Sequence, residues 1–144
     1  MGARLTSISN FTAFTGLETL EFSDNSISTF SMSGSFPNLT NISMQRNGMT
    51  SINISNLTNL TSFGLNQNPI TDINIASNIN LNFVGLNTTQ LTESAVNNIL
   101  IQLDNHGLIG GACAMTSGTS AAPTGAGITA KNNLIAKGWS VSTN

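Results

Sequence analysis

Three closely similar stretches recur in the first half of the chain, at intervals of 22 and 21 residues. They begin at Leu17, Leu39 and Leu60 and share the pattern Leu-x-x-Leu-x-Leu-x-x-Asn, with Phe, Ile or Met at some leucine positions. A fixed period of this length is typical of a solenoid, in which each coil covers the apolar face of the next. Because a solenoid usually presents a surface, the repeat favours binding or assembly over catalysis.

A second apolar segment begins two residues after each asparagine of the pattern, at Ile27, Met49 and Ile70. Both segments alternate apolar and polar residues, which predicts short strands whose apolar side chains point inward. Residues 5–8 match the second segment, so we expect the chain to open halfway through a coil and to leave an uncapped edge there. The polar residues of the first segments should line one outer sheet face, a candidate binding face made of Thr19, Glu21, Asn41, Ser43, Ser62 and Gly64.

Asn25, Asn47 and Asn68 end the first segments, where the chain must turn. A buried asparagine at this point can pair with backbone N–H and C=O groups of its own coil and the next. We therefore predict a structural ladder of asparagines. In a fourth first segment, which begins at Leu81, Thr89 takes the place of the asparagine, and we expect the regular stack to end there.

The pattern over residues 5–90 resembles the leucine-rich repeat family, specifically its short bacterial type with coils of 21 to 22 residues. Phe, Ile and Met at leucine positions are swaps that keep the core volume similar. The resemblance implies a curved parallel sheet used for protein recognition, and it implies no catalytic residue.

After residue 91 the apolar spacing changes from that of a strand to that of a helix. Thr92 is suited to be an N-cap and Gly107 a C-terminal stop, so we predict a helix between them. The apolar stripe of this helix is expected to consist of Val96, Ile99, Leu100 and Leu103.

A second helix is predicted over about residues 126–136, between a strand at 112–115 and a last strand at 139–141. Such a series can extend a parallel sheet and cover the open end of a stack. The expected fold class is an α/β solenoid, with leucine-rich-repeat coils over residues 1–90 and a βαβαβ capping module over residues 91–144. The second helix should bury Ile128, Leu134 and Ile135, and the core of the cap should contain Leu100, Leu134 and Trp139.

Residues 95–144 are similar to a terminal module of bacteriophage virion and tail-fibre-like proteins. The matching stretches are AVNNIL (95–100), GG (110–111), APTG (122–125), TAK (129–131), LIAKGW (134–139) and VSTN (141–144). The resemblance implies a phage or bacterial surface protein rather than a particular activity.

Charged residues make up only 7% of the chain, and the net charge is -2. Four basic residues cannot form the stripe that nucleic-acid binding requires. No stretch is long enough for a membrane span, and the N-terminal residues do not resemble a signal peptide. We expect a cytoplasmic protein or one that leaves the cell by another route, such as a virus particle released by lysis.

Asn-x-Ser/Thr triplets, as at Asn38 and Asn59, are expected from a composition rich in these residues rather than from glycosylation.

The titratable residues form no catalytic or metal-binding pattern. His106, the single histidine, is expected to face solvent at a helix end. Cys113, the single cysteine, lies in an apolar run and is expected to be a small buried side chain. We therefore expect neither an enzyme nor a bound cofactor or metal ion.

Three functions agree with these features. The first is a structural protein of a phage virion, such as a decoration, fibre or tail component. The second is an adhesin that recognises a host surface protein or glycan through the outer sheet faces. The third is a filament subunit that stacks on other copies through its uncapped N-terminal end. The first two place the protein in the virion or on an extracellular surface.

Overall fold

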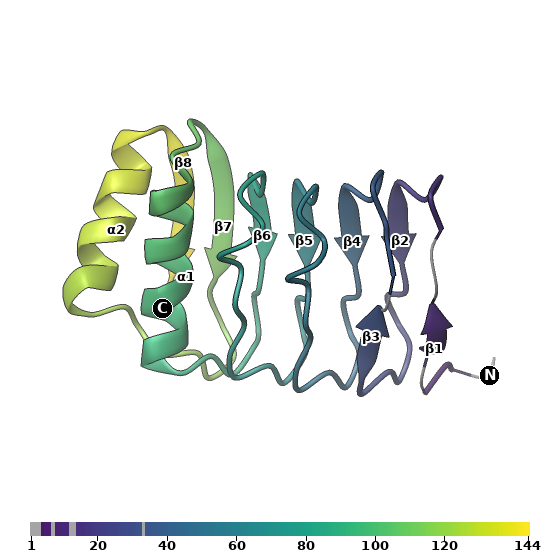
Figure 1. Cartoon of the computed structure of the whole chain (residues 1–144). Helices are drawn as coiled ribbons and strands as arrows, with labels where there is room; N and C mark the ends of the chain where they lie inside the picture. Colours follow the sequence, from purple (N-terminus) through teal and green to yellow (C-terminus); the bar gives the residue numbers. More distant parts are fainter. Residues whose placement is uncertain (1–3, 7, 12–13, 33) are drawn as a thin grey trace.

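The computed structural model describes residues 4–6, 8–11, 14–32 and 34–144, and its architecture is α/β (Figure 1). Six parallel strands form one open sheet in the order β2-β4-β5-β6-β7-β8, and two further strands form a small parallel sheet, β1-β3. The large sheet consists of β2 (Thr19–Glu21), β4 (Asn41–Ser43), β5 (Ser62–Gly64), β6 (Phe83–Gly85), β7 (Gly111–Met115) and β8 (Trp139–Thr143). The small sheet consists of β1 (Ile8–Phe11) and β3 (Phe30–Met32).

Equivalent positions of the sequence repeats lie side by side in the large sheet. Leu20 is paired with Ile42, Ile42 with Phe63, and Phe63 with Val84. All four side chains are buried, so the alternation read from the sequence does point one residue of each strand into the core. Cys113 of β7 continues this row beside Val84.

The second segments form strands only in the first part of the chain, as β1 and β3. The strand prediction is wrong for the two later repeats, although their isoleucines are still mostly buried. In both repeats an asparagine side chain, Asn53 or Asn74, accepts a hydrogen bond from the backbone N–H two residues later. This local bond turns the backbone where a strand would have continued.

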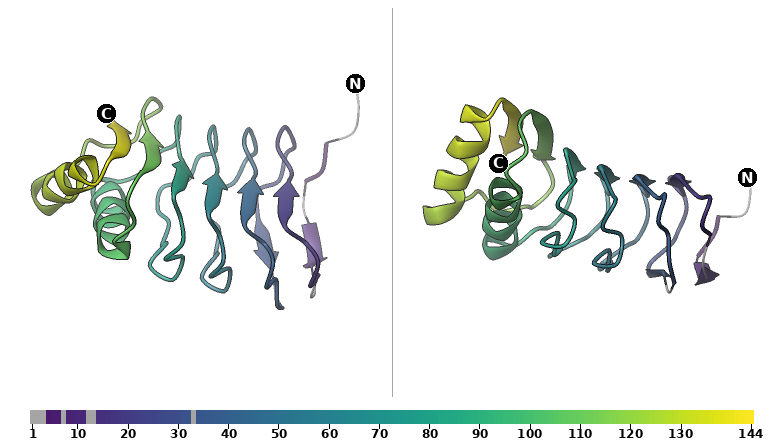
Figure 2. Two further views of the ribbon diagram at one scale, coloured as in Figure 1. Left: turned by 90° about the horizontal axis from the view of Figure 1, so that it is seen from above. Right: turned by 45° about the horizontal axis from the view of Figure 1, so that its top comes forward.

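The C-terminal module adds helix α1 (Glu93–His106), strand β7, helix α2 (Gly125–Ala136) and strand β8. The predicted cap residues of α1 are confirmed, because the Thr92 side chain accepts a hydrogen bond from the Ala95 N–H and Gly107 has a φ of 73°. Both helices lie on the same side of the large sheet as β1 and β3, at the end far from the N-terminus (Figures 1 and 2).

The buried side of α2 differs from the prediction. Leu134 is buried, but Ile128 and Ile135 are 47% and 49% exposed. The helix instead turns Gly127 and Ala130 inward, toward α1. A Cβ atom at position 127 would lie 2.0 Å from the Asn97 side-chain oxygen, so close packing of the two helices selects small residues over large apolar ones.

The core of the module agrees with the prediction. Leu100 and Leu134 are fully buried and Trp139 is 4% exposed. The indole Nε1–H of Trp139 donates a hydrogen bond to the Leu108 carbonyl at 3.0 Å, which satisfies its polar atom. Gly111 lies against the ring, where a Cβ atom would be only 2.9 Å from two indole carbons.

An ion pair joins the two helices. Lys137 Nζ lies 2.7 Å from Asp104 Oδ1, and Asn133 donates to Asp104 Oδ2 at 2.8 Å. Partial burial acts to raise the pKa of Asp104, but the hydrogen bonds from Asn133 and Lys137 and the charge of Lys137 outweigh it and lower that pKa. Asp104 is thus held in its charged form at the α1–α2 contact.

Within the described part of the chain, neither α1 nor α2 combines the length and the apolar character of a bilayer-crossing helix.

Candidate binding surfaces

The predicted polar face lies on the large sheet, but it is narrower than expected. Thr19, Glu21 and Asn41 are exposed, and Ser43 and Ser62 are half-buried. Gly64 is buried and therefore does not contribute an accessible contact. The face becomes apolar at β6, where Phe83 is paired with Ser62 of β5 and is 44% exposed. Sequence reasoning missed Phe83, because it occupies a position that is polar in the other repeats.

A hydrogen-bonded group of side chains crosses this face between two repeats. The Ser23 and Ser43 hydroxyl oxygens are 3.2 Å apart, and the backbone N–H of Ser23 donates to Glu21 Oε1 at 3.0 Å. Partial burial acts to raise the pKa of Glu21, but hydrogen bonds from Ser23 and Ser43 prevail and lower it. Glu21 is therefore a fixed negative charge in a polar, otherwise neutral surface.

Asn25, Asn47 and Asn68 each pair with backbone groups of two repeats. Asn68 accepts a hydrogen bond from the Met49 N–H at 3.0 Å and donates to the Met44 and Leu65 carbonyls at 2.9 and 3.0 Å. Asn47 makes the corresponding bonds one repeat earlier, and Asn25 accepts from the Leu5 N–H. The partners in the second repeat belong to the preceding repeat rather than to the next, which corrects the predicted direction.

The asparagine row ends at Thr89, as its sequence suggests, but the sheet does not. The Thr89 hydroxyl lies 2.7 Å from the Leu86 carbonyl and 3.0 Å from the Ser120 hydroxyl. Ser120 in turn accepts from the Leu91 N–H at 3.1 Å. Two buried hydroxyls thus take over the role of an asparagine side chain, and β7 and β8 extend the sheet beyond the repeats.

A second row of asparagines was missed by sequence reasoning. Asn38, Asn59 and Asn80 donate to the carbonyls of Thr15, Pro37 and Thr58, at 2.7, 2.7 and 3.1 Å. Each one directly precedes the first leucine of a repeat, and this recurrence is the signal that would have revealed the row. Because all three side chains are exposed, the row forms part of the surface.

A row of residues with left-handed backbone conformation follows the carboxyl ends of the strands, opposite to the second asparagine row. Asp24, Arg46, Gln67, Thr88 and Ser117 have φ values between 52° and 66°. A left-handed conformation is uncommon for residues other than glycine. Here it recurs where the chain leaves β2, β4, β5, β6 and β7. The predicted Asp24–Arg46 pair lies in this row, with Arg46 Nη2 2.6 Å from Asp24 Oδ2. The pair is exposed, so it adds little to stability.

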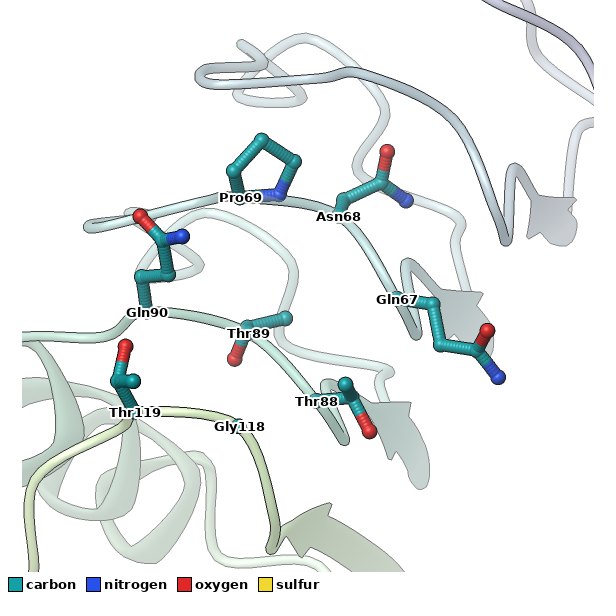
Figure 3. Close-up of a pocket in the computed structure, with 8 residues that line it drawn as sticks. All are labelled: Gln67, Asn68, Pro69, Thr88, Thr89, Gln90, Gly118 and Thr119. Atoms are coloured by element: carbon teal, nitrogen blue, oxygen red, sulfur yellow. The ribbon is translucent and has the colours of Figure 1, made fainter.

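A pocket of about 310 Å³ lies beside this row, where the repeats meet the C-terminal module (Figure 3). Its lining includes Pro69, Gly118 and the side chains of Thr88, Gln90 and Thr119. Gly118 has a φ of 68°, and a Cβ atom there would lie 2.4 Å from the Thr89 carbonyl oxygen. The two backbones therefore approach closely beside the pocket. The neutral side chains that line it can exchange hydrogen bonds but cannot transfer protons near neutral pH.

The titratable residues singled out by the sequence lie apart from these surfaces. Cys113 is buried, and burial raises the pKa of its thiol to about 12. His106 ends α1 but is half-buried rather than solvent-facing, because it packs near Ala76. Burial lowers the pKa of His106, against a smaller opposing effect of the Ala76 backbone. Among the residues that the structure describes, no three His, Cys, Asp or Glu side chains are grouped as metal ligands.

Comparison with known proteins finds no match for the chain among family models, curated proteins or solved structures.

Proposed function

We propose that the protein is a non-enzymatic structural protein of a bacteriophage particle, which acts through assembly and surface presentation. In this proposal the repeats form a leucine-rich-repeat solenoid, closed at one end by the α/β module. The proposal rests on one observation: some polar side chains bond neighbouring repeats to each other, whereas others are exposed to solvent. Two asparagine rows hold neighbouring repeats together, while a nearly uncharged polar face remains available to solvent.

The two ion pairs of the described region support the same proposal. Asp24 pairs with Arg46 across two repeats, and Asp104 pairs with Lys137 across two helices. These pairs connect structural elements and do not converge on a pocket. The likeness of residues 95–144 to a terminal module of phage virion and tail-fibre-like proteins supports the location. The neighbours in the particle would be other virion proteins or further copies of the chain.

The alternative function is recognition of a host surface protein or glycan, as in an adhesin. The observation that favours it is the adjacent placement of Thr19 and Asn41, which are in register and both exposed on the large sheet. A lysine at either position would add a long charged side chain to this face without entering the core.

The two functions are separated by presenting the labelled, purified protein to two targets. The targets are host cells and particles of the corresponding phage produced without this chain. A structural protein is expected to saturate the particles at a fixed stoichiometry and to leave the cells unlabelled. Failure to bind such particles would refute the structural role.

An adhesin is expected instead to label the cells, and Thr19→Lys should abolish this labelling. Thr29→Lys is the matched control, because Thr29 is exposed and lies outside the large sheet. Cell binding that survives Thr19→Lys and Asn41→Lys together would exclude this face as the recognition surface.

A further inference from the structure

We propose that a groove at the amino-terminal ends of the strands binds a neutral, extended glycan. The groove has a volume of about 590 Å³ and runs across four successive repeats. It adjoins the polar sheet face but is made by different residues. The side chains on which the proposal rests are Glu18, Asn38, Thr40, Asn59, Thr61 and Asn80.

The three asparagines of the groove are held in fixed orientations. Asn38, Asn59 and Asn80 each use one amide N–H to bond a carbonyl of the preceding repeat. Their Oδ1 atoms accept no hydrogen bond from the described residues. Each amide therefore offers one acceptor oxygen and one further N–H at a position set by the fold. Preorganised groups of this kind bind a ligand at a smaller entropic cost than free side chains do.

The threonines continue the same arrangement. Thr40 donates to the Glu18 carbonyl and Thr61 to the Thr40 carbonyl, each at 3.3 Å. Because the hydroxyl hydrogen is used within the protein, the remaining lone pairs of each oxygen are available as acceptors. The groove thus combines acceptors with a few donors, which complements a ligand whose hydroxyl groups both donate and accept.

The spacing of these groups matches an elongated ligand. Equivalent atoms of neighbouring repeats are separated by about the distance between adjacent strands, ~4.8 Å. Sugar rings in an extended β-1,4-linked chain follow each other at a comparable spacing. Such a chain can place hydroxyl groups opposite Asn38, Asn59 and Asn80 in turn, whereas a coiled α-1,4-linked chain cannot.

The charge of the groove selects against anionic ligands. Glu18 is the one charged side chain among its lining residues, and no basic residue lies there to bind phosphate or sulfate. A carboxylate accepts strong hydrogen bonds from hydroxyl groups. The chemistry therefore fits a neutral glycan, and its binding should depend little on ionic strength.

The test is an NMR titration of the whole chain with three soluble hexamers: β-1,4-linked glucose, β-1,4-linked N-acetylglucosamine and α-1,4-linked glucose. We expect at least one β-linked hexamer to shift the side-chain amide signals of Asn38, Asn59 and Asn80, and to bind at least tenfold more tightly than the α-linked one. Equal binding of α- and β-linked chains, or no shift at millimolar concentration with either β-linked hexamer, would overturn the proposal. Binding of the polyamine spermidine in place of the hexamers would also overturn it.

Variants locate the site. Thr40→Val with Thr61→Val removes two hydroxyl groups with little change of shape and should weaken β-linked binding tenfold or more. The control is Thr71→Val, since Thr71 is exposed, lies outside the groove and makes no side-chain hydrogen bond within the described region. Thermal unfolding would verify that both variants are folded. Equal affinities for the two variants would place binding elsewhere. The proposal does not rest on the phage-particle role, because the titration measures glycan binding by the isolated chain and uses no particles.

Discussion

Replacement of Asn68 by alanine tests the asparagine ladder most severely. Asn68 is 1% exposed and lies between repeats that are themselves well packed. Its side chain pairs with one backbone N–H, that of Met49, and with the carbonyls of Met44 and Leu65. Alanine removes the side-chain partner of all three backbone groups at a buried position.

The expected loss of stability follows from those three bonds. Removal of one partner from a buried hydrogen bond costs about 1–3 kcal/mol, so we expect Asn68→Ala to destabilise the fold by about 3–5 kcal/mol. This is a large share of the ~5–15 kcal/mol that stabilises a typical domain. Asn25→Ala removes similar bonds at a more exposed position, where water can replace the side chain, and should cost about 1 kcal/mol.

The assay is urea unfolding followed by far-ultraviolet circular dichroism and by the fluorescence of Trp139, the single tryptophan. Circular dichroism reports on the whole chain and the fluorescence on the C-terminal module, so coincident curves would indicate one cooperative unit. Asn82→Ala is the control, because the Asn82 side chain is exposed and makes no hydrogen bond within the described region. A loss for Asn68→Ala that is no greater than the loss for Asn82→Ala would refute the ladder as a source of stability.

Three further predictions concern the C-terminal module. Gly127→Ala should destabilise the protein by about 1–3 kcal/mol in the same unfolding assay, because the added methyl group would overlap the Asn97 side chain. Gly16→Ala is the control: its methyl group would meet no atom, so its effect should be close to zero. The Cys113 thiol, whose pKa is raised to about 12, should not react with a thiol reagent at pH 8 until the protein unfolds; rapid reaction of the native protein would contradict its burial. Asp104 has a lowered pKa in the folded state, so its stabilising effect should be complete above about pH 4 and be lost as the pH falls through the folded pKa. The Asp104→Asn variant should therefore lose less unfolding free energy on acidification than the wild-type protein does. An equal dependence of stability on pH in the two proteins would show that the α1–α2 ion pair is without effect.

The elements of the fold that repeat were predictable from the sequence. Leu20, Ile42 and Phe63 occupy the same position of the pattern, and only parallel strands in register bring such positions side by side. The helix caps Thr92 and Gly107 were predictable for a local reason, since their side-chain and backbone preferences depend on few neighbours.

The parts that sequence reasoning missed depend on tertiary contacts. The buried side of α2 could not be found from hydrophobicity, because close approach to Asn97 places Gly127 inward and turns Ile128 outward. Ser120 lies in a loop that has no repeat pattern, and its hydroxyl takes the place of a ladder asparagine. The recurrence of Asn38, Asn59 and Asn80 is visible in the sequence, but Asn38 and Asn59 also match the glycosylation triplet, and this second pattern hides their structural role.

The proposed role in a phage particle is tested most directly by quantitative mass spectrometry of purified particles. We expect the chain to be present at a high copy number, and its ratio to the major capsid protein to be the same in every density-gradient fraction that contains intact particles. Absence of the chain from such fractions, or a ratio that varies between them and falls on washing, would refute a structural role in the particle.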